Sequence, residues 1–244
     1  MIRIFDNADS LLENAARKII SAAREAVDKR GRFVIALSGG HSPRPLYRLL
    51  AGQPYSDQIP WKHTIVLWSD ERYVPIDDKR SNAGTALELL LKHVPIPDDQ
   101  ILPMYIQGVI PEDAANRYQA ALVNLFKTGL PSLDLTLLGC GKDGHTASLF
   151  PGSSLIKEKE ALVAAVKKEG DVPRITMTPP LINQSRRIIF IVYGSEKAEA
   201  VEKVLEGSGE AEELPARAIE PLKGEIHWLL DQQAASNLMK VGSD

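Results

Sequence analysis

The chain has 244 residues, 44% of them hydrophobic and 25% charged, a composition typical of a folded globular protein rather than a disordered one. Its formal net charge of -3 argues against a broad nucleic-acid-binding surface, which needs clustered basic residues. A single cysteine, no apolar stretch of roughly 18 residues and an N-terminus without an apolar signal-peptide core predict a cytoplasmic protein with no intrachain disulfide and no membrane span.

Apolar periodicity predicts the secondary structure along the chain. Residues 10–30 carry apolar side chains at helical spacing, which predicts an amphipathic helix. Short apolar runs rich in β-branched or aromatic residues predict buried parallel strands at 33–37, 64–68, 133–138, 188–193 and 226–230. Helical patterns lie at 45–50, 83–93, 112–127 and 196–205. This alternation predicts a doubly wound, mainly parallel α/β sheet, and because it continues past each proline-containing break we expect one domain over residues 1–244.

The turn after the first predicted strand is the first candidate binding segment, since ligands of open α/β sheets bind beyond the carboxyl ends of strands. Ser38-Gly39-Gly40 leads into a helix that we expect to begin near Pro43 or Pro45. Paired glycines let successive N–H groups turn toward one point, and a helix N-terminus adds partial positive charge there. The turn therefore suits a phosphate group. The alternative is a tight turn that needs glycine only for steric reasons.

A charged segment follows the second predicted strand. Asp70, Glu71 and Arg72 stand where side chains can orient a water molecule or bind substrate hydroxyls. The alternative is a solvated surface segment followed by a helix N-cap at Ser81 or Asn82.

The segment after the third predicted strand places Asp143 and His145 within three residues. A neutral histidine can take a proton from water, and a neighbouring carboxylate can fix its tautomer, so this pair predicts a general base. Two alternatives are weaker. The glycines at 139, 141 and 144 match a dinucleotide-binding pattern, but Pro151 would interrupt the required helix after about two turns. Cys140, Asp143 and His145 together offer only three metal ligands, whereas structural zinc sites usually have four.

Arg174 and Lys197 are candidate phosphate partners, although single basic residues are more often solvated surface charges. The sequence contains no G-x-S-x-G nucleophile elbow, so a hydrolase on this sheet is expected to activate water directly.

Five segments together resemble the 6-phosphogluconolactonase family. They are SGGHSP at 38–43, SDERYVP at 69–75 with RSN at 80–82, GCGKDGHTASLFP at 139–151, PRITMT at 173–178 and GSEKA at 194–198. The resemblance implies a single, Rossmann-like, three-layer α/β/α domain. It also implies hydrolysis of 6-phospho-D-glucono-1,5-lactone to 6-phosphogluconate in the pentose phosphate pathway, without a metal or organic cofactor.

The resemblance also implies roles for individual residues. His145 matches the general base, Asp143 the acid beside it and Arg72 the basic residue of the DER motif. The phosphate side is matched by Ser38, Gly39, Gly40 and Ser42 of the glycine turn, with Arg174 and Lys197. Asp70 is a further candidate substrate contact, and we expect Arg72 or backbone N–H groups near Gly141 to stabilise a tetrahedral oxyanion. His41 departs from the small residue that relatives often carry at this place.

Two other function classes compete with the lactonase. A deaminase or isomerase of the same superfamily carries an acid just before the proline that follows its DGH motif, whereas this chain has Phe150 there. A non-catalytic sugar-phosphate-binding domain would need the glycine turn but not the Asp143–His145 pair. We therefore expect a small phosphosugar lactone as the substrate, no nucleic-acid or membrane partner, and no requirement for oligomerisation.

Overall fold

The structure is a computed structural model in which residues 1–127, 130–167 and 169–239 are described. The strands are β1 (Ile2–Phe5), β2 (Phe33–Leu37), β3 (Thr64–Trp68), β4 (Asp70–Arg72), β5 (Leu135–Leu138), β6 (Val163–Val166), β7 (Arg174–Met177), β8 (Arg187–Val192) and β9 (Glu225–Asp231). The α-helices are α1 (Ala8–Arg30), α2 (Arg44–Ala51), α3 (Asn82–Leu89), α4 (Pro111–Phe126), α5 (Pro179–Ile182) and α6 (Ala198–Leu205).

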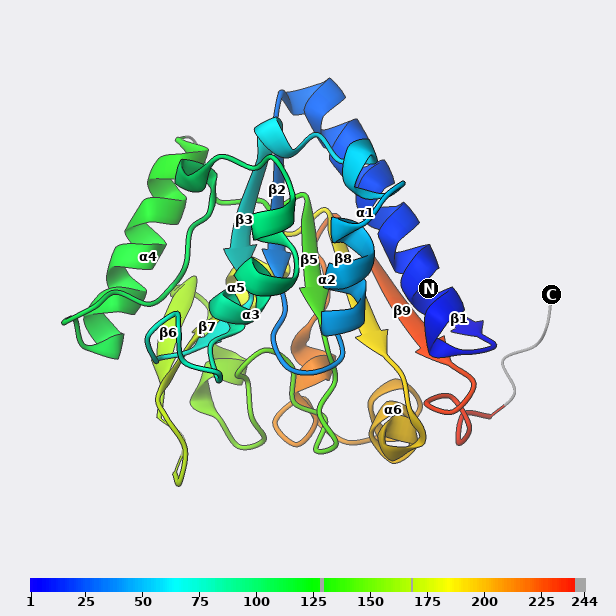
Figure 1. Ribbon diagram of the computed structural model, residues 1–244. Helices are drawn as coiled ribbons and strands as arrows, with labels where there is room; N and C mark the ends of the chain where they lie inside the picture. The colour runs from blue at the N-terminus through cyan, green and yellow to red at the C-terminus, as the bar shows by residue number, and fades with distance from the viewer. Residues whose placement is uncertain (128–129, 168, 240–244) are drawn as a thin grey trace.

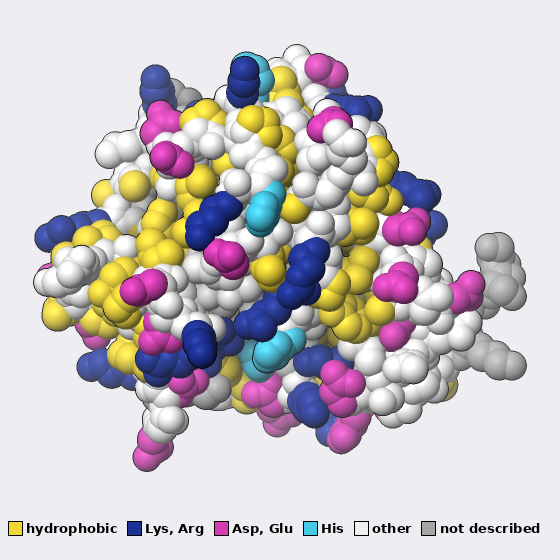
Figure 2. Space-filling model, viewed as in Figure 1, with side chains coloured by type: hydrophobic (Ala, Val, Ile, Leu, Met, Phe, Trp, Pro, Cys, Tyr) yellow, Lys and Arg dark blue, Asp and Glu magenta, His cyan; other side chains and the backbone are white. Residues whose placement is uncertain are grey.

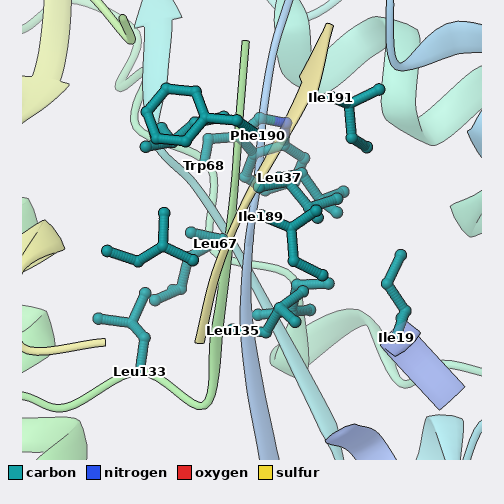
Figure 3. Close-up of a cluster of buried hydrophobic side chains, with 14 of the residues drawn as sticks. Ile19, Leu37, Leu67, Trp68, Leu133, Leu135, Ile189, Phe190 and Ile191 are labelled. Atoms are coloured by element: carbon teal, nitrogen blue, oxygen red, sulfur yellow. The ribbon is translucent and has the colours of Figure 1, made fainter. Parts of the chain in front are cut away.

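The main sheet contains all five predicted strands. Its order is β1-β9-β8-β5-β2-β3, and every pairing in it is parallel, as the apolar runs predict. Every residue of β2 and β5 is buried, because helices cover both faces of the sheet. Figure 3 shows side chains of four neighbouring strands packed together in the core, among them Leu37, Trp68 and Phe190.

The helices lie in layers on the two faces of this sheet. From β2 the chain crosses to β3 on one side, whereas from β8 it crosses to β9 in the opposite direction. Because such crossovers are right-handed, α2 and α6 lie on opposite faces. Helix α1 packs on β2, β8 and β9 and also on α2, which in turn packs on α3 (Figure 1). The predicted doubly wound, three-layer α/β/α architecture is therefore confirmed.

A second sheet of three antiparallel strands, in the order β4-β7-β6, was not predicted. Helix α4 packs on β6 and β7, at the flank of the molecule beside β3 (Figure 1). The alternative that 70–72 is a solvated surface segment is wrong, because these residues form β4 and pair with Arg174, Ile175 and Thr176 of β7. Smaller corrections concern helix ends. The predicted helix 83–93 ends at Leu89 before a 3-10 turn, and 196–205 begins with a 3-10 turn over Ser195–Lys197.

The sheet order places the site. Chain connections run in opposite directions from β2 and β5, so the loops after these two adjacent strands separate and leave a crevice at their carboxyl ends. The loop after β2 begins at Ser38 and the loop after β5 at Gly139. Within the described ranges, no helix is both long enough and apolar enough to cross a membrane.

Candidate active site

A pocket of about 270 Å³ opens at this crevice. Figure 2 shows Lys, Arg and His side chains gathered with a few acids below the strand ends of the same view. Ten of the predicted site residues line the pocket, namely Ser38, Gly39, Gly40, Ser42, Asp70, Arg72, Gly141, His145, Arg174 and Lys197. The topology thus brings together residues that are up to 159 positions apart in the sequence, from Ser38 to Lys197.

The glycine turn after β2 presents free backbone donors. Among the described residues, the N–H groups of Gly39, Gly40 and Ser42 find no hydrogen-bond acceptor. Two tyrosines hold the carbonyls at the ends of the turn: Tyr47 Oη donates to the Ser38 oxygen at 2.5 Å and Tyr193 Oη to the Ser42 oxygen at 3.0 Å. With both carbonyls engaged, the turn offers its N–H groups to an anion. Neither tyrosine was among the predicted site residues, because no local pattern links them to the turn.

The loop after β5 holds the Asp–His pair in a short hydrogen bond. Asp143 Oδ1 lies 2.5 Å from His145 Nδ1 and also accepts the backbone N–H of His145 at 3.2 Å. Burial acts to raise the pKa of Asp143, but the hydrogen bonds from His145 outweigh it and hold that pKa below its usual range. An ionised carboxylate at Nδ1 favours the tautomer with the proton on Nδ1, which leaves Nε2 as the acceptor. Asp143 itself does not line the pocket but lies behind the imidazole.

Glycines allow the sharp turn of this loop. A Cβ at Gly141 would lie 2.0 Å from His145 Nδ1, and Gly144 has a φ of 76°. A turn and a short β-bridge follow instead of a helix, so the dinucleotide alternative is wrong. Among the backbone N–H groups near Gly141 that were expected as oxyanion donors, that of Gly141 itself already donates to the His145 carbonyl at 2.8 Å.

Two arginines stand side by side on the second sheet. Arg72 and Arg174 are partners in the β4–β7 register, and Nε of each is buried without a partner among the described residues. Arg72 Nη1 donates to the Arg80 carbonyl at 3.1 Å, and Arg174 Nη2 lies 2.6 Å from Asp171 Oδ2. Both arginines line the pocket, so their guanidinium groups place positive charge beside an anionic ligand.

Phe150 lies between Arg174 and the predicted base. The Arg174 guanidinium carbon is 5.3 Å from the centre of the Phe150 ring, and that ring is 4.9 Å from the imidazole of His145. The Phe150 ring thus places an apolar contact between these two groups and has no proton donor or acceptor.

The acids of the DER motif have separate surroundings. Asp70 lines the pocket and accepts the Ser148 hydroxyl at 2.7 Å. Glu71 is fully buried and accepts the N–H groups of Asn82 and Ala83, both at 2.7 Å, at the start of α3. Burial raises the pKa of Glu71 to about 7 against the opposing effect of these donors. Glu71 is thus a structural residue, and the predicted N-cap at Ser81 is confirmed by its bond from the Gly84 N–H at 2.9 Å.

Lys197 and Cys140 meet at the floor of the pocket. Lys197 Nζ donates to the Cys140 carbonyl at 2.9 Å, which places its charge at the carboxyl end of β5. Cys140 is 4% exposed, and burial raises the pKa of its thiol to about 12. Within the part of the chain that the structure describes, no three His, Cys, Asp or Glu side chains are grouped to hold a metal ion, so the alternative of a metal site at Cys140 has no ligand set there.

Comparisons with known proteins agree with this geometry. The family model for glucosamine-6-phosphate isomerases/6-phosphogluconolactonase matches residues 6–228. The 6-phosphogluconolactonase of Synechocystis sp. is 40% identical over 97% of this chain and 98% of that protein, and the one from Mycobacterium bovis is 37% identical over 97% and 98%. The solved 6-phosphogluconolactonase from Trypanosoma cruzi superposes with a TM-score of 0.85 at 27% identity, covering 98% of this chain and 97% of that one. A monomeric glucosamine-6-phosphate deaminase, at 24% identity and a TM-score of 0.82 over 97% and 99%, shares the fold.

Proposed function

The chain belongs to the glucosamine-6-phosphate isomerase/6-phosphogluconolactonase family, and from this premise we propose how its residues perform lactone hydrolysis. It is an enzyme that converts 6-phospho-D-glucono-1,5-lactone to 6-phosphogluconate, a step of the pentose phosphate pathway. One observation carries the mechanism: His145 Nδ1 lies 2.5 Å from Asp143 Oδ1, in the same site as the glycine turn after β2 with its free N–H groups.

The phosphate group of the substrate binds at the glycine turn. Within the described ranges, the N–H groups of Gly39, Gly40 and Ser42 donate no hydrogen bond to the protein. Lys197 and Arg174 supply positive charge in the same pocket. Ser38 completes this end of the pocket at the carboxyl end of β2. These N–H groups and the two cations can together bind a phosphate dianion. Because the net charge of the protein is negative, this local positive charge is needed to attract an anionic substrate.

The lactone carbonyl is opened by water. His145 Nε2 takes a proton from a water molecule, and the hydroxide oxygen forms a bond to the carbonyl carbon. Arg72, which lines the pocket, stabilises the resulting oxyanion with its guanidinium group. When the bond between this carbon and the ring oxygen breaks, protonated His145 returns the proton to that oxygen. The product carboxyl group then loses its proton to solvent, and no covalent intermediate forms.

Asp143 and Asp70 support these reaction steps in different ways. Asp143 keeps the proton of neutral His145 on Nδ1 and stabilises the imidazolium after proton transfer. Asp70 is held by Ser148 with one carboxylate oxygen, and its place in the pocket suits a sugar hydroxyl. These two carboxylates are therefore assigned separate roles.

We further propose that the enzyme works in the cytoplasm as one domain, without a metal or organic cofactor, an obligatory partner chain or a nucleic acid. The net charge of -3 and the complete set of proposed substrate groups within one chain support this proposal.

A time course with freshly prepared lactone tests the function. Catalytic amounts of the protein are expected to open 6-phosphoglucono-1,5-lactone far faster than the spontaneous control without enzyme, with acid release equal to lactone consumed. Opening at the spontaneous rate, with a folded protein, would contradict the proposal.

A further inference from the structure

Asn82 lies at the pocket with both the oxygen and the nitrogen of its amide hydrogen-bonded to the protein. This first residue of α3 is 3% exposed and lines the pocket, although its sequence position indicates only a helix start. Its Nδ2 donates to the Asp70 carbonyl at 2.9 Å, and its Oδ1 accepts Arg72 Nη1 at 3.0 Å. An amide used in this way has little capacity left for a substrate. Its effect on the reaction must pass through the groups that it holds.

The same amide packs against the glycine turn. A Cβ at Gly39 would lie 2.1 Å from both Nδ2 and Oδ1 of Asn82. Gly39 has no left-handed φ, so glycine is required there by this close approach rather than by backbone conformation. Asn82 therefore contacts the turn after β2 and the arginine of β4 at once.

The backbone of Asn82 is itself fixed. Its N–H donates to Glu71 Oε1 at 2.7 Å, and Glu71 is fully buried. The glycine turn extends from the main sheet, whereas Arg72 belongs to the second sheet. Asn82 lies between them at the start of α3, and the carboxyl group of Glu71 in β4 holds its backbone.

We propose that Asn82 is a positioning residue that fixes the spacing between the phosphate-binding turn and Arg72. The inference rests on the proposed function, because it takes these two groups to bind opposite ends of the substrate. Fixed spacing lets a lactone whose phosphate binds at the turn place its carbonyl at Arg72 and His145 at the same time, so that both groups contribute to binding. Specificity for a phosphorylated lactone then depends on Asn82.

The test uses the ratio of kcat/KM for 6-phosphogluconolactone to kcat/KM for unphosphorylated gluconolactone. Asn82→Ala frees Arg72 and the turn, so this ratio is expected to fall about 10-fold, and 6-phosphogluconate should bind about 10-fold more weakly by calorimetry. Ser81→Ala is the matched control, because Ser81 caps the same helix and its hydroxyl bonds to the Gly84 N–H and to Glu71 rather than to Arg72. It is expected to lower Tm and leave the ratio unchanged.

A double-mutant comparison tests the contact with the turn. Gly39→Ala alone should weaken 6-phosphogluconate binding at least 10-fold, since its new methyl group overlaps the Asn82 amide. In Gly39→Ala/Asn82→Ala the amide is gone, so the double variant is expected to bind better than Gly39→Ala. Asn82→Ser removes the same amide and serves if the alanine variant fails to fold.

An unchanged ratio in folded Asn82→Ala or Asn82→Ser, or a double variant that binds no better than Gly39→Ala, would overturn the proposal. Binding of 6-phosphogluconate needs no chemistry, so these outcomes are independent of whether His145 proves to be the base.

Discussion

Lys197 and Arg174 are the side chains whose charge we assign to the substrate phosphate. Their contacts with Cys140 and Asp171 hold them in the pocket from different elements. Because the phosphate is remote from the carbonyl, its contacts act nearly equally on ground and transition states. Lys197→Ala and Arg174→Ala are therefore expected to raise KM for the phosphorylated lactone about 10-fold or more with a smaller change in kcat, measured by initial rates.

Unphosphorylated gluconolactone is the control for both variants. It lacks the group that the two cations bind, so its slower hydrolysis should change little. Equal losses on both lactones would show that these residues do not act on the phosphate.

Cys140 provides a separate measurement of how closed the pocket floor is. Burial raises its thiol pKa to about 12, and only the thiolate reacts with disulfide reagents. At pH 8 the native protein is expected to react with a chromogenic disulfide about 10³-fold more slowly than a free thiol. Reaction of this single cysteine should become fast in denaturing urea. Rapid labelling of the native protein would mean that the loop after β5 opens readily.

At the level of elements, α3 depends on the buried carboxylate of Glu71. Its folded-state pKa of about 7 is above the ordinary value of 4.5, so between these pH values the folded state keeps a proton that the unfolded state has lost. The contribution of Glu71 to stability is therefore fully present below about pH 4.5 and decreases as the pH rises to about 7.

Glu71→Gln isolates this effect, because glutamine does not titrate. The variant should be less stable than the parent by about 1–3 kcal/mol at low pH, since the amide nitrogen that replaces one oxygen cannot accept the N–H group of Asn82 or Ala83 that this oxygen accepts. The difference in unfolding free energy between parent and variant is expected to shrink by up to about 3 kcal/mol from pH 4.5 to pH 7. Urea titrations at several pH values measure it. A difference that stays constant or grows over this pH range would contradict the raised pKa of Glu71.

For the molecule as a whole, the main sheet follows from the sequence because each of its core strands is a continuous apolar run. Residues 33–37 and 64–68 form strands with the predicted bounds, since burial on both faces leaves no polar position to obscure the pattern. The second sheet lacks this signal. Strand β4 consists of Asp70, Glu71 and Arg72, and only its pairing with β7 makes these charged residues a buried strand.

Only some of the residues that line or support the pocket could be predicted from the sequence. Residues next to strand ends, such as His145 and Lys197, could be predicted because topology brings strand ends together. Asn82, Tyr47 and Tyr193 act on the pocket from helices or from a strand end by contacts across the fold. No local spacing encodes those contacts.

The whole molecule shares its fold with a glucosamine-6-phosphate deaminase, yet we expect no release of ammonia from glucosamine 6-phosphate. Ring opening in the deaminase pattern uses an acid at the position that Phe150 occupies here, and the Phe150 ring packs between Arg174 and His145. An ammonia assay at saturating substrate measures this. Robust ammonia release would contradict both the role of Phe150 and the lactonase specificity.

The role of His145 as the base that activates water is tested most directly by kcat of His145→Ala on freshly prepared 6-phosphogluconolactone, corrected for spontaneous opening. Circular dichroism and binding of 6-phosphogluconate establish that the variant is folded with an intact phosphate end. We predict that kcat falls by roughly 10²–10⁴-fold while product binding changes little, because general-base catalysis contributes about that much. A folded variant that binds product and turns over at nearly the parent rate would contradict the mechanism.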